Sequence, residues 1–178
     1  MRAVVIDGPG RVGIREVPDP IPGPGEIVVT VRAAGICGTD LHLLAGDLPY
    51  DDFPLIPGHE FCGEVAAVGP DVDDAWVGRL VACDPNLPCG GCEECRRGRS
   101  NLCDRYAALG VTLAGAAAEV VRVPVGRAHL LPHEMDLDAA ALIEPLACAV
   151  HGLDLLPRRP GDRHLIYGAG PMGVLMGM

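Results

Sequence analysis

The sequence contains no lysine: all 14 of its basic residues are arginines, set against 24 Asp and Glu residues. The lack of lysine excludes a P-loop lysine, a Schiff-base lysine and a Tyr–Lys proton-transfer pair. The formal net charge of -10 disfavours a nucleic-acid partner, because clustered basic charge is what binds a phosphate backbone. Arg96, Arg97 and Arg99 do cluster, but Glu93 and Glu94 lie beside them.

Aromatic residues are also scarce, at 3 % of the chain, whereas hydrophobic residues of all kinds make up 49 %. This hydrophobic content is typical of a globular protein and too high for a disordered one. A length of 178 residues allows one good-sized domain together with the start of another. We therefore expect a folded chain whose core consists mainly of Val, Leu, Ile and Ala.

Long apolar runs are missing as well. Residues 1–10 lack the apolar stretch of a signal peptide, and no run reaches the 18 residues of a membrane span. We expect a cytoplasmic protein with no membrane partner. In that compartment the eight cysteines are interpreted as metal ligands or buried thiols rather than as disulfides.

Short strands and turns dominate most of the chain. Alternating apolar residues and Gly- or Pro-rich turns predict strands at 3–6, 12–14, 27–31, 58–72, 80–83, 116–123 and 129–131. The first helical pattern covers 136–156, capped by Asp136 or Asp138 and kinked or broken by Pro145. A linker at 157–161 then leads to a short strand at 164–167.

The strongest motif is a run of four cysteines with short spacings, in a segment that has almost no apolar residues. Four thiolates at such spacing can surround one zinc ion and replace a missing core. Two alternatives remain open here, an iron–sulfur cluster and unliganded thiols, although the usual ferredoxin motif continues differently. The residues are Cys89, Cys92, Cys95 and Cys103.

A second set of metal-binding side chains is scattered along the sequence. Cys37, the neighbouring pair His59 and Glu60, and Glu144 offer one thiolate, one imidazole and two carboxylates. Three such ligands and a water make an open, catalytic type of zinc site. Spacing alone does not show that these residues meet. The remaining cysteines, Cys62, Cys83 and Cys148, are expected to be buried thiols.

These motifs together resemble the zinc-dependent medium-chain alcohol and polyol dehydrogenases, in the order in which that family carries them. The resemblance covers the whole chain and rests on Gly58-His59-Glu60-x2-Gly63-x5-Gly69-x2-Val72, on Gly38-Thr39-Asp40-x-His42 after Cys37, on the four cysteines, and on Gly168-x-Gly170-x-x-Gly173. It implies a mainly β, GroES-like barrel catalytic domain with a zinc-binding lobe, followed by the truncated start of an α/β Rossmann domain. The implied divisions are 1–135 with the lobe at 84–104, connecting helices at 136–160, and the Rossmann start at 161–178.

The resemblance also implies roles for individual residues. Cys37 and His59 would ligate a catalytic zinc, and Glu60 and Glu144 would sit at the metal as direct, alternating or water-mediated ligands. Thr39 would take the hydroxyl proton of the substrate and pass it through the cofactor ribose to His42. Asp40 would hold the ring of His59 in one tautomer.

The implied activity is oxidation of a secondary alcohol by hydride transfer to NAD or NADP. The Glu-Pro-Leu sequence at 144–146 favours a polyol or vicinal diol as the substrate. Gly168, Gly170 and Gly173 would bind the cofactor pyrophosphate at a helix N-terminus. Family members are about twice as long, and we expect a homo-oligomer at full length, with a small-molecule substrate as its partner and no nucleic acid or membrane.

The expected ribose-binding acid lies beyond Met178, so we expect the 178 residues alone not to bind the cofactor. One alternative remains open, namely a non-catalytic remnant that binds only the structural zinc.

Overall fold

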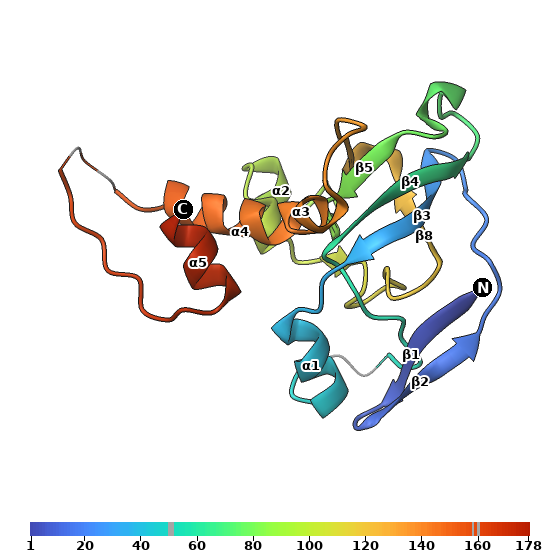
Figure 1. Ribbon diagram of the computed structural model, residues 1–178, viewed down its shortest axis with the longest axis horizontal. Coiled ribbons are helices and arrows are strands. Elements are labelled where there is room, and N and C mark those ends of the chain that lie inside the picture. The colour runs from blue at the N-terminus through green and yellow to red at the C-terminus, as the bar shows by residue number, and fades with distance from the viewer. Residues whose placement is uncertain (50–51, 158, 160) are drawn as a thin grey trace.

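The computed structural model describes residues 1–49, 52–157, 159 and 161–178 (Figure 1). Arg158 and Pro160, in the predicted linker, lie outside the described residues. The N-terminal part carries the sheets, and the helices that follow extend away from them on the other side of the molecule. Within the described part, no helix is long and apolar enough to cross a membrane.

The chain begins with a two-stranded antiparallel sheet of β1 (Arg2–Gly8) and β2 (Arg11–Glu16). A Pro-Gly turn joins the two strands, as the turn residues predict. β1 buries alternate side chains, whereas β2 is largely exposed, because only β1 faces the rest of the molecule.

The main sheet has five antiparallel strands in the order β8-β3-β4-β5-β9. Its centre is the pair β3 (Glu26–Ala34) and β4 (Phe61–Val68), which runs from Ile27 opposite Val68 to Ala34 opposite Phe61 with two register shifts in between. The other strands are β5 (Leu80–Cys83), β8 (Val120–Pro124) and β9 (Ala128–Leu130). The sequence-based strand predictions in this region are confirmed, with shorter bounds for β4 and β8.

The hydrophobic core lies on the main sheet and is mainly aliphatic, as the low aromatic content of the sequence predicts. Phe61 is its one large aromatic side chain among the most deeply buried residues, and β-branched residues fill most of the rest. Such residues pack well on a pleated surface. The residues with no more than 1 % exposure in this cluster are Ile27, Val29, Phe61, Val65, Val81 and Val123.

Backbone contacts of β1 connect the two sheets. Val4 N–H donates to Ala117 O at 2.7 Å, and Ala3 forms a bridge with Ala118 just before β8 begins. Further along the same edge of β1, Ile6 pairs with Leu55. These contacts curl the strands into the expected GroES-like arrangement.

The short α1 (Gly38–Ala45) follows β3 and lies beside β1, where its Leu43 clusters with Ile6, and it carries the Thr-Asp-x-His motif (Figure 1). Smaller elements lie within the cysteine-rich region and on either side of it in the chain. They are β6 (Asn86–Leu87), α2 (Glu93–Arg96), β7 (Ala107–Ala108) and the 3-10 helices Asp74–Trp76, Ser100–Leu102 and Val125–Arg127.

The predicted helical segment is two helices, α3 (Leu137–Ala141) and α4 (Ile143–Asp154). Asp136 caps α3 by accepting from Ala139 N–H at 2.9 Å. The break falls at Leu142, so that Pro145 lies in the first turn of α4, where its missing N–H does no harm.

The predicted strand at 164–167 is wrong, because residues 162–169 form neither helix nor strand. Leu165 is 91 % exposed and Tyr167 fully so, since no strand among the described residues lies beside them to supply hydrogen bonds. The glycine motif does open a helix, α5 (Pro171–Gly177), which packs against α4.

Candidate metal centres

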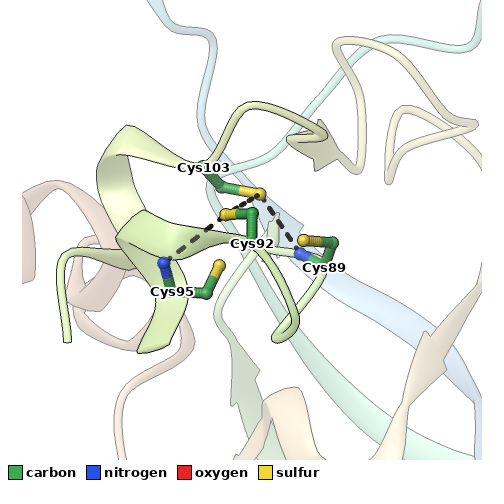
Figure 2. Close-up of side chains that lie close together, drawn as sticks. All are labelled: Cys89, Cys92, Cys95 and Cys103. Carbon is green, nitrogen blue, oxygen red and sulfur yellow. Dashed lines mark hydrogen bonds between the residues drawn. The ribbon is translucent and has the colours of Figure 1, made fainter. Parts of the chain in front are cut away.

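The four cysteines of the lobe converge on one point (Figure 2). Their sulfur atoms all lie within 4.8 Å of one another, and Cys92 Sγ and Cys103 Sγ are 3.9 Å apart. Four sulfurs around one zinc at about 2.3 Å stand about 3.8 Å apart. The donor set therefore fits a single ion, and it leaves no room for the several irons and sulfides of a cluster.

Local backbone structure places these thiols. Cys92 caps α2 and its sulfur accepts from Cys95 N–H at 3.5 Å, while Cys103 Sγ accepts from Cys89 N–H at 3.3 Å. Gly90 and Gly98 have φ of +69° and +76°, values that other residues rarely adopt. The lobe thus folds around the sulfurs through turns rather than through an apolar core.

Electrostatics also prepare this site for a cation. Hydrogen bonds from backbone N–H groups, that of Gly91 foremost, lower the pKa of Cys89 to about 6. Loss of hydration raises the pKa of Cys95 to about 12, and the neighbouring thiols add to the shift. A bound zinc ion would displace the proton of the Cys95 thiol. Arg105 donates to Cys89 Sγ at 3.4 Å and so offsets part of the thiolate charge.

The second group unites Cys37, His59 and Glu60, whose ligand atoms also lie within 4.8 Å of one another. Cys37 is the N-cap of α1, and the other two residues immediately precede β4. The register of β3 with β4 brings these segments together, and Gly35 N–H extends it by donating to Glu60 O at 2.7 Å. One thiol, one imidazole and one carboxylate form a donor set that suits a zinc site with an open position.

Gly35 makes room for the carboxylate of this group. A Cβ at position 35 would lie 3.2 Å from the Cβ of Glu60 and would collide with its carboxylate. The sequence analysis did not identify Gly35. The glycine directly before the Ile-Cys pair was the available signal, but only the structure shows what the missing side chain leaves free.

Asp40 organises the backbone around this second group. Its carboxylate is buried and accepts from Cys37 N–H at 2.8 Å and from Gly58 N–H at 3.1 Å. His59 Nδ1 lies 3.7 Å from Asp40 Oδ1, and within the described residues this buried nitrogen has no hydrogen-bond partner. A small ring rotation would give it Asp40 as acceptor, which is the arrangement that fixes a metal-binding histidine.

Thr39 and His42 lie on α1 beside the group, one turn apart. Thr39 Oγ1 is 3.7 Å from Cys37 Sγ and half-buried, whereas His42 is exposed and its Nδ1 is 3.2 Å from Asp47 Oδ2. The structure thus places one hydroxyl at the donor group and one imidazole at the surface.

Glu144 lies close to the second group without belonging to it. Burial raises the pKa of its carboxyl, while His59 lowers it and Glu60 raises it further. Its Oε1 accepts from the thiol of Cys148 at 3.4 Å. Partial loss of hydration, with Glu144 adding to the shift, raises the pKa of that thiol to about 11 although the residue as a whole is exposed. The prediction that Cys148 is buried is wrong, because it is exposed on α4; Cys62 and Cys83 are buried as predicted.

A cleft of about 830 Å³ lies between the cysteine lobe, the end of β5 and α4. Glu144, Cys148 and His151 line it from the helix, and Asp84 and Arg127 line it from the sheet as a pair 2.8 Å apart. Polar and charged side chains therefore line part of a space next to Glu144.

Gly168, Gly170 and Gly173 lie far along the chain, around the start of α5. Gly168 has a φ of +115°, Gly170 is the N-cap of α5, and a Cβ on Gly173 would press on the backbone of Gly168. The three glycines therefore form a tight turn that opens a helix, without the preceding strand that the motif predicts.

The family model for the alcohol dehydrogenase GroES-like domain matches residues 23–133. The chain therefore belongs to the zinc-dependent alcohol and polyol dehydrogenase family, as the motifs indicate. Among curated relatives it is 37 % identical to L-galactonate-5-dehydrogenase of Escherichia coli K12, over 98 % of this chain and 51 % of the relative. It is 40 % identical to D-altritol 5-dehydrogenase of Agrobacterium fabrum, over 100 % of this chain and 54 % of that protein.

The chain is also similar to solved structures of dehydrogenases. A zinc-binding dehydrogenase of Sinorhizobium meliloti 1021, bound to NADP, has a TM-score of 0.94 at 42 % identity, over 98 % of this chain and 51 % of that one. An alcohol dehydrogenase from E. coli CFT073, complexed with NADH, has a TM-score of 0.93 at 38 % identity, over 99 % and 51 %. The chain spans about half the length of the relatives it matches.

Proposed function

We propose that this protein is the N-terminal part of a zinc-dependent oxidoreductase that oxidises a secondary alcohol, a polyol or a vicinal diol, with NAD or NADP as hydride acceptor. The convergence of Cys37, His59 and Glu60 carries this proposal. The sugar-alcohol and sugar-acid dehydrogenases among its relatives support the substrate class.

Zinc at this centre would supply Lewis acidity, which lowers the pKa of a hydroxyl group bound to it. Cys37, His59 and Glu60 would hold the ion, with Asp40 orienting the imidazole of His59. Thr39, whose hydroxyl lies next to Cys37, would accept the proton of the substrate hydroxyl. His42 would then release that proton to water, a role that fits its exposed position beside Asp47.

The cofactor would bind in the part of the molecule that begins near residue 161. The turn of Gly168, Gly170 and Gly173 supports a pyrophosphate site there, because it brings backbone N–H groups to the start of α5. The bound NADP and NADH of the similar structures support a nicotinamide cofactor. We propose the divisions 1–135, 136–160 and 161–178 on the same basis.

The cysteine lobe would bind a second, structural zinc. Its four sulfurs leave no position for a substrate, and the segment has no apolar core of its own.

Metal stoichiometry tests the proposal directly. The protein should bind two zinc ions per chain, counted by elemental analysis after dialysis. Cys37→Ser combined with His59→Ala should lose one of them, and Cys62→Ser, at a thiol outside both groups, should keep both. A single zinc in the unmodified protein would instead support the remnant that has only the structural ion. Two zinc ions in the double variant would overturn the ligand assignment.

A further inference from the structure

Cys148 lies one helical turn after Glu144 on α4 and donates its S–H to Glu144 Oε1 at 3.4 Å. Side chains four residues apart on a helix face the same side, so this contact follows from the spacing. Both residues line the cleft beside the cysteine lobe. Neither the proposed mechanism nor the structural zinc uses this thiol.

Two carboxylates compete for the second metal centre. Glu60 belongs to the group of donors within 4.8 Å, and Glu144 does not, although it lies within electrostatic reach of both His59 and Glu60. The number of protein ligands decides the kind of zinc site. Three ligands leave a position for a substrate, whereas four close the site.

We propose that Cys148 is a positioning residue that holds the Glu144 carboxylate outside the group of Cys37, His59 and Glu60, so that a bound metal keeps one open position. The inference rests on the proposed function, because it needs a metal at this centre. The hydrogen bond from the Cys148 thiol occupies a lone pair of Glu144 Oε1 and holds the carboxylate against its own helix. Without that donor, the carboxylate would turn toward the cation and become a fourth ligand.

Cobalt(II) provides a spectroscopic readout that does not depend on activity. The protein is stripped of metal and reloaded with Co(II), and the second centre is observed as the difference from the Cys37→Ser variant. Imidazole is the probe of the open position: it should shift the cobalt absorption of the unmodified protein. Affinity for Co(II) is measured by competition with a chelator.

Cys148→Ala should bind Co(II) at this centre about tenfold more tightly, and its spectrum should no longer respond to imidazole. Cys148→Ser keeps a hydrogen-bond donor and should behave like the unmodified protein. The double variant Cys148→Ala with Glu144→Gln should regain the imidazole response, because the neutral amide is a poor fourth ligand. Val150→Ala, on the same helix and 48 % exposed, is the matched control and should change neither quantity.

An unchanged affinity and imidazole response in Cys148→Ala would overturn this inference and leave the proposed function standing. A double variant that behaves like Cys148→Ala would also overturn it, because Glu144 would then not be the added ligand. A Co(II) spectrum of the unmodified protein with no contribution from Cys37 would overturn the proposed function, and the inference with it.

Discussion

Single residues with small or buried side chains determine the geometry of the second metal centre. Gly35 contributes only space, and Asp40 contributes two hydrogen bonds that hold Cys37 and Gly58 in place. Neither is among the three donors that come together there. The ligand types could be predicted from the sequence, but the role of Gly35 depends on how close Glu60 lies in the fold.

We predict that Gly35→Ala weakens metal binding at the second centre about tenfold, because the added Cβ displaces the Glu60 carboxylate. Competition with a chelator measures the effect. Gly38→Ala is the matched control, since a Cβ at that position meets no atom within 4 Å. Equal affinities for the two variants would contradict the proposed place of Glu60 among the ligands.

Asp40→Ala should lower the free energy of unfolding by about 3 kcal/mol in the metal-free protein, because the buried N–H of Gly58 and the half-buried N–H of Cys37 lose their acceptor. Urea denaturation measures this change, and Asp40→Asn, which keeps one oxygen acceptor, should lose less. Asp47→Ala removes an exposed carboxylate and should change stability by no more than about 0.5 kcal/mol. A loss as large at Asp47 would show that the effect does not come from buried hydrogen bonds.

Among the structural elements, the cysteine lobe has little apolar core of its own. Its short helix α2 and the two-residue strands β6 and β7 bury few side chains, so we expect a metal bound by the four sulfurs to hold them together. This could be predicted from the sequence, because the four cysteines lie close together in the chain and the segment between them is polar. Closure of such a segment depends little on the remainder of the fold.

Removal of zinc with a chelator should therefore release the lobe before the sheets. Hydrogen exchange should become at least about tenfold faster across residues 86–106 and remain slow in β3 and β4, because metal binding here acts as folding free energy. Cys92→Ser should reproduce this pattern without a chelator, and Cys148→Ser should not. Uniform loss of protection across the whole chain would show that the lobe and the sheets unfold as one unit.

At the scale of the whole molecule, the contact between the two sheets depends on residues far apart in the sequence. Arg2 N–H and its guanidinium both donate to the Glu119 carboxylate, and the guanidinium is 2.8 Å from Oε1. These bonds hold the pKa of Glu119 below its ordinary value of 4.5, with the backbone N–H of Arg2 as the largest cause. The ion pair is thus a pH-sensitive link between β1 and the segment before β8.

The direction of this pH dependence follows from linkage. The carboxylate stabilises the folded protein fully above pH 4.5, and this contribution is lost as the pH falls through the lowered pKa. Glu119→Gln should therefore flatten the acid limb of stability, measured by thermal unfolding between about pH 5 and pH 3. Glu64→Gln, which removes an exposed pair within one sheet, should leave the limb steeper than Glu119→Gln does. If Glu119→Gln leaves the acid limb unchanged, the pair of Arg2 and Glu119 does not contribute to the loss of stability at low pH.

Whole-molecule context also explains why the strand at 164–167 was predicted wrongly. Its residues have the apolar, β-branched and aromatic character of a buried strand. A strand needs partners for its backbone groups, and the described residues supply none beside Leu165 or Tyr167. The local sequence showed residues that favour a strand, but it could not show whether another strand would lie beside them.

The sequence by itself determined the local features: the turns and strands, the cap at Asp136, the helix break near Pro145 and the cysteine lobe. Each depends on residues within a few positions of one another, where chain geometry leaves few choices. Only the tertiary structure decided how the second centre forms. The register that pairs Ala34 with Phe61 brings Cys37 to His59 and Glu60, and the separate position of α4 leaves Glu144 outside their group and in contact with Cys148. The pairing of strands that are distant in the sequence depends on how the whole core packs, and the spacing of residues within a short motif does not determine it.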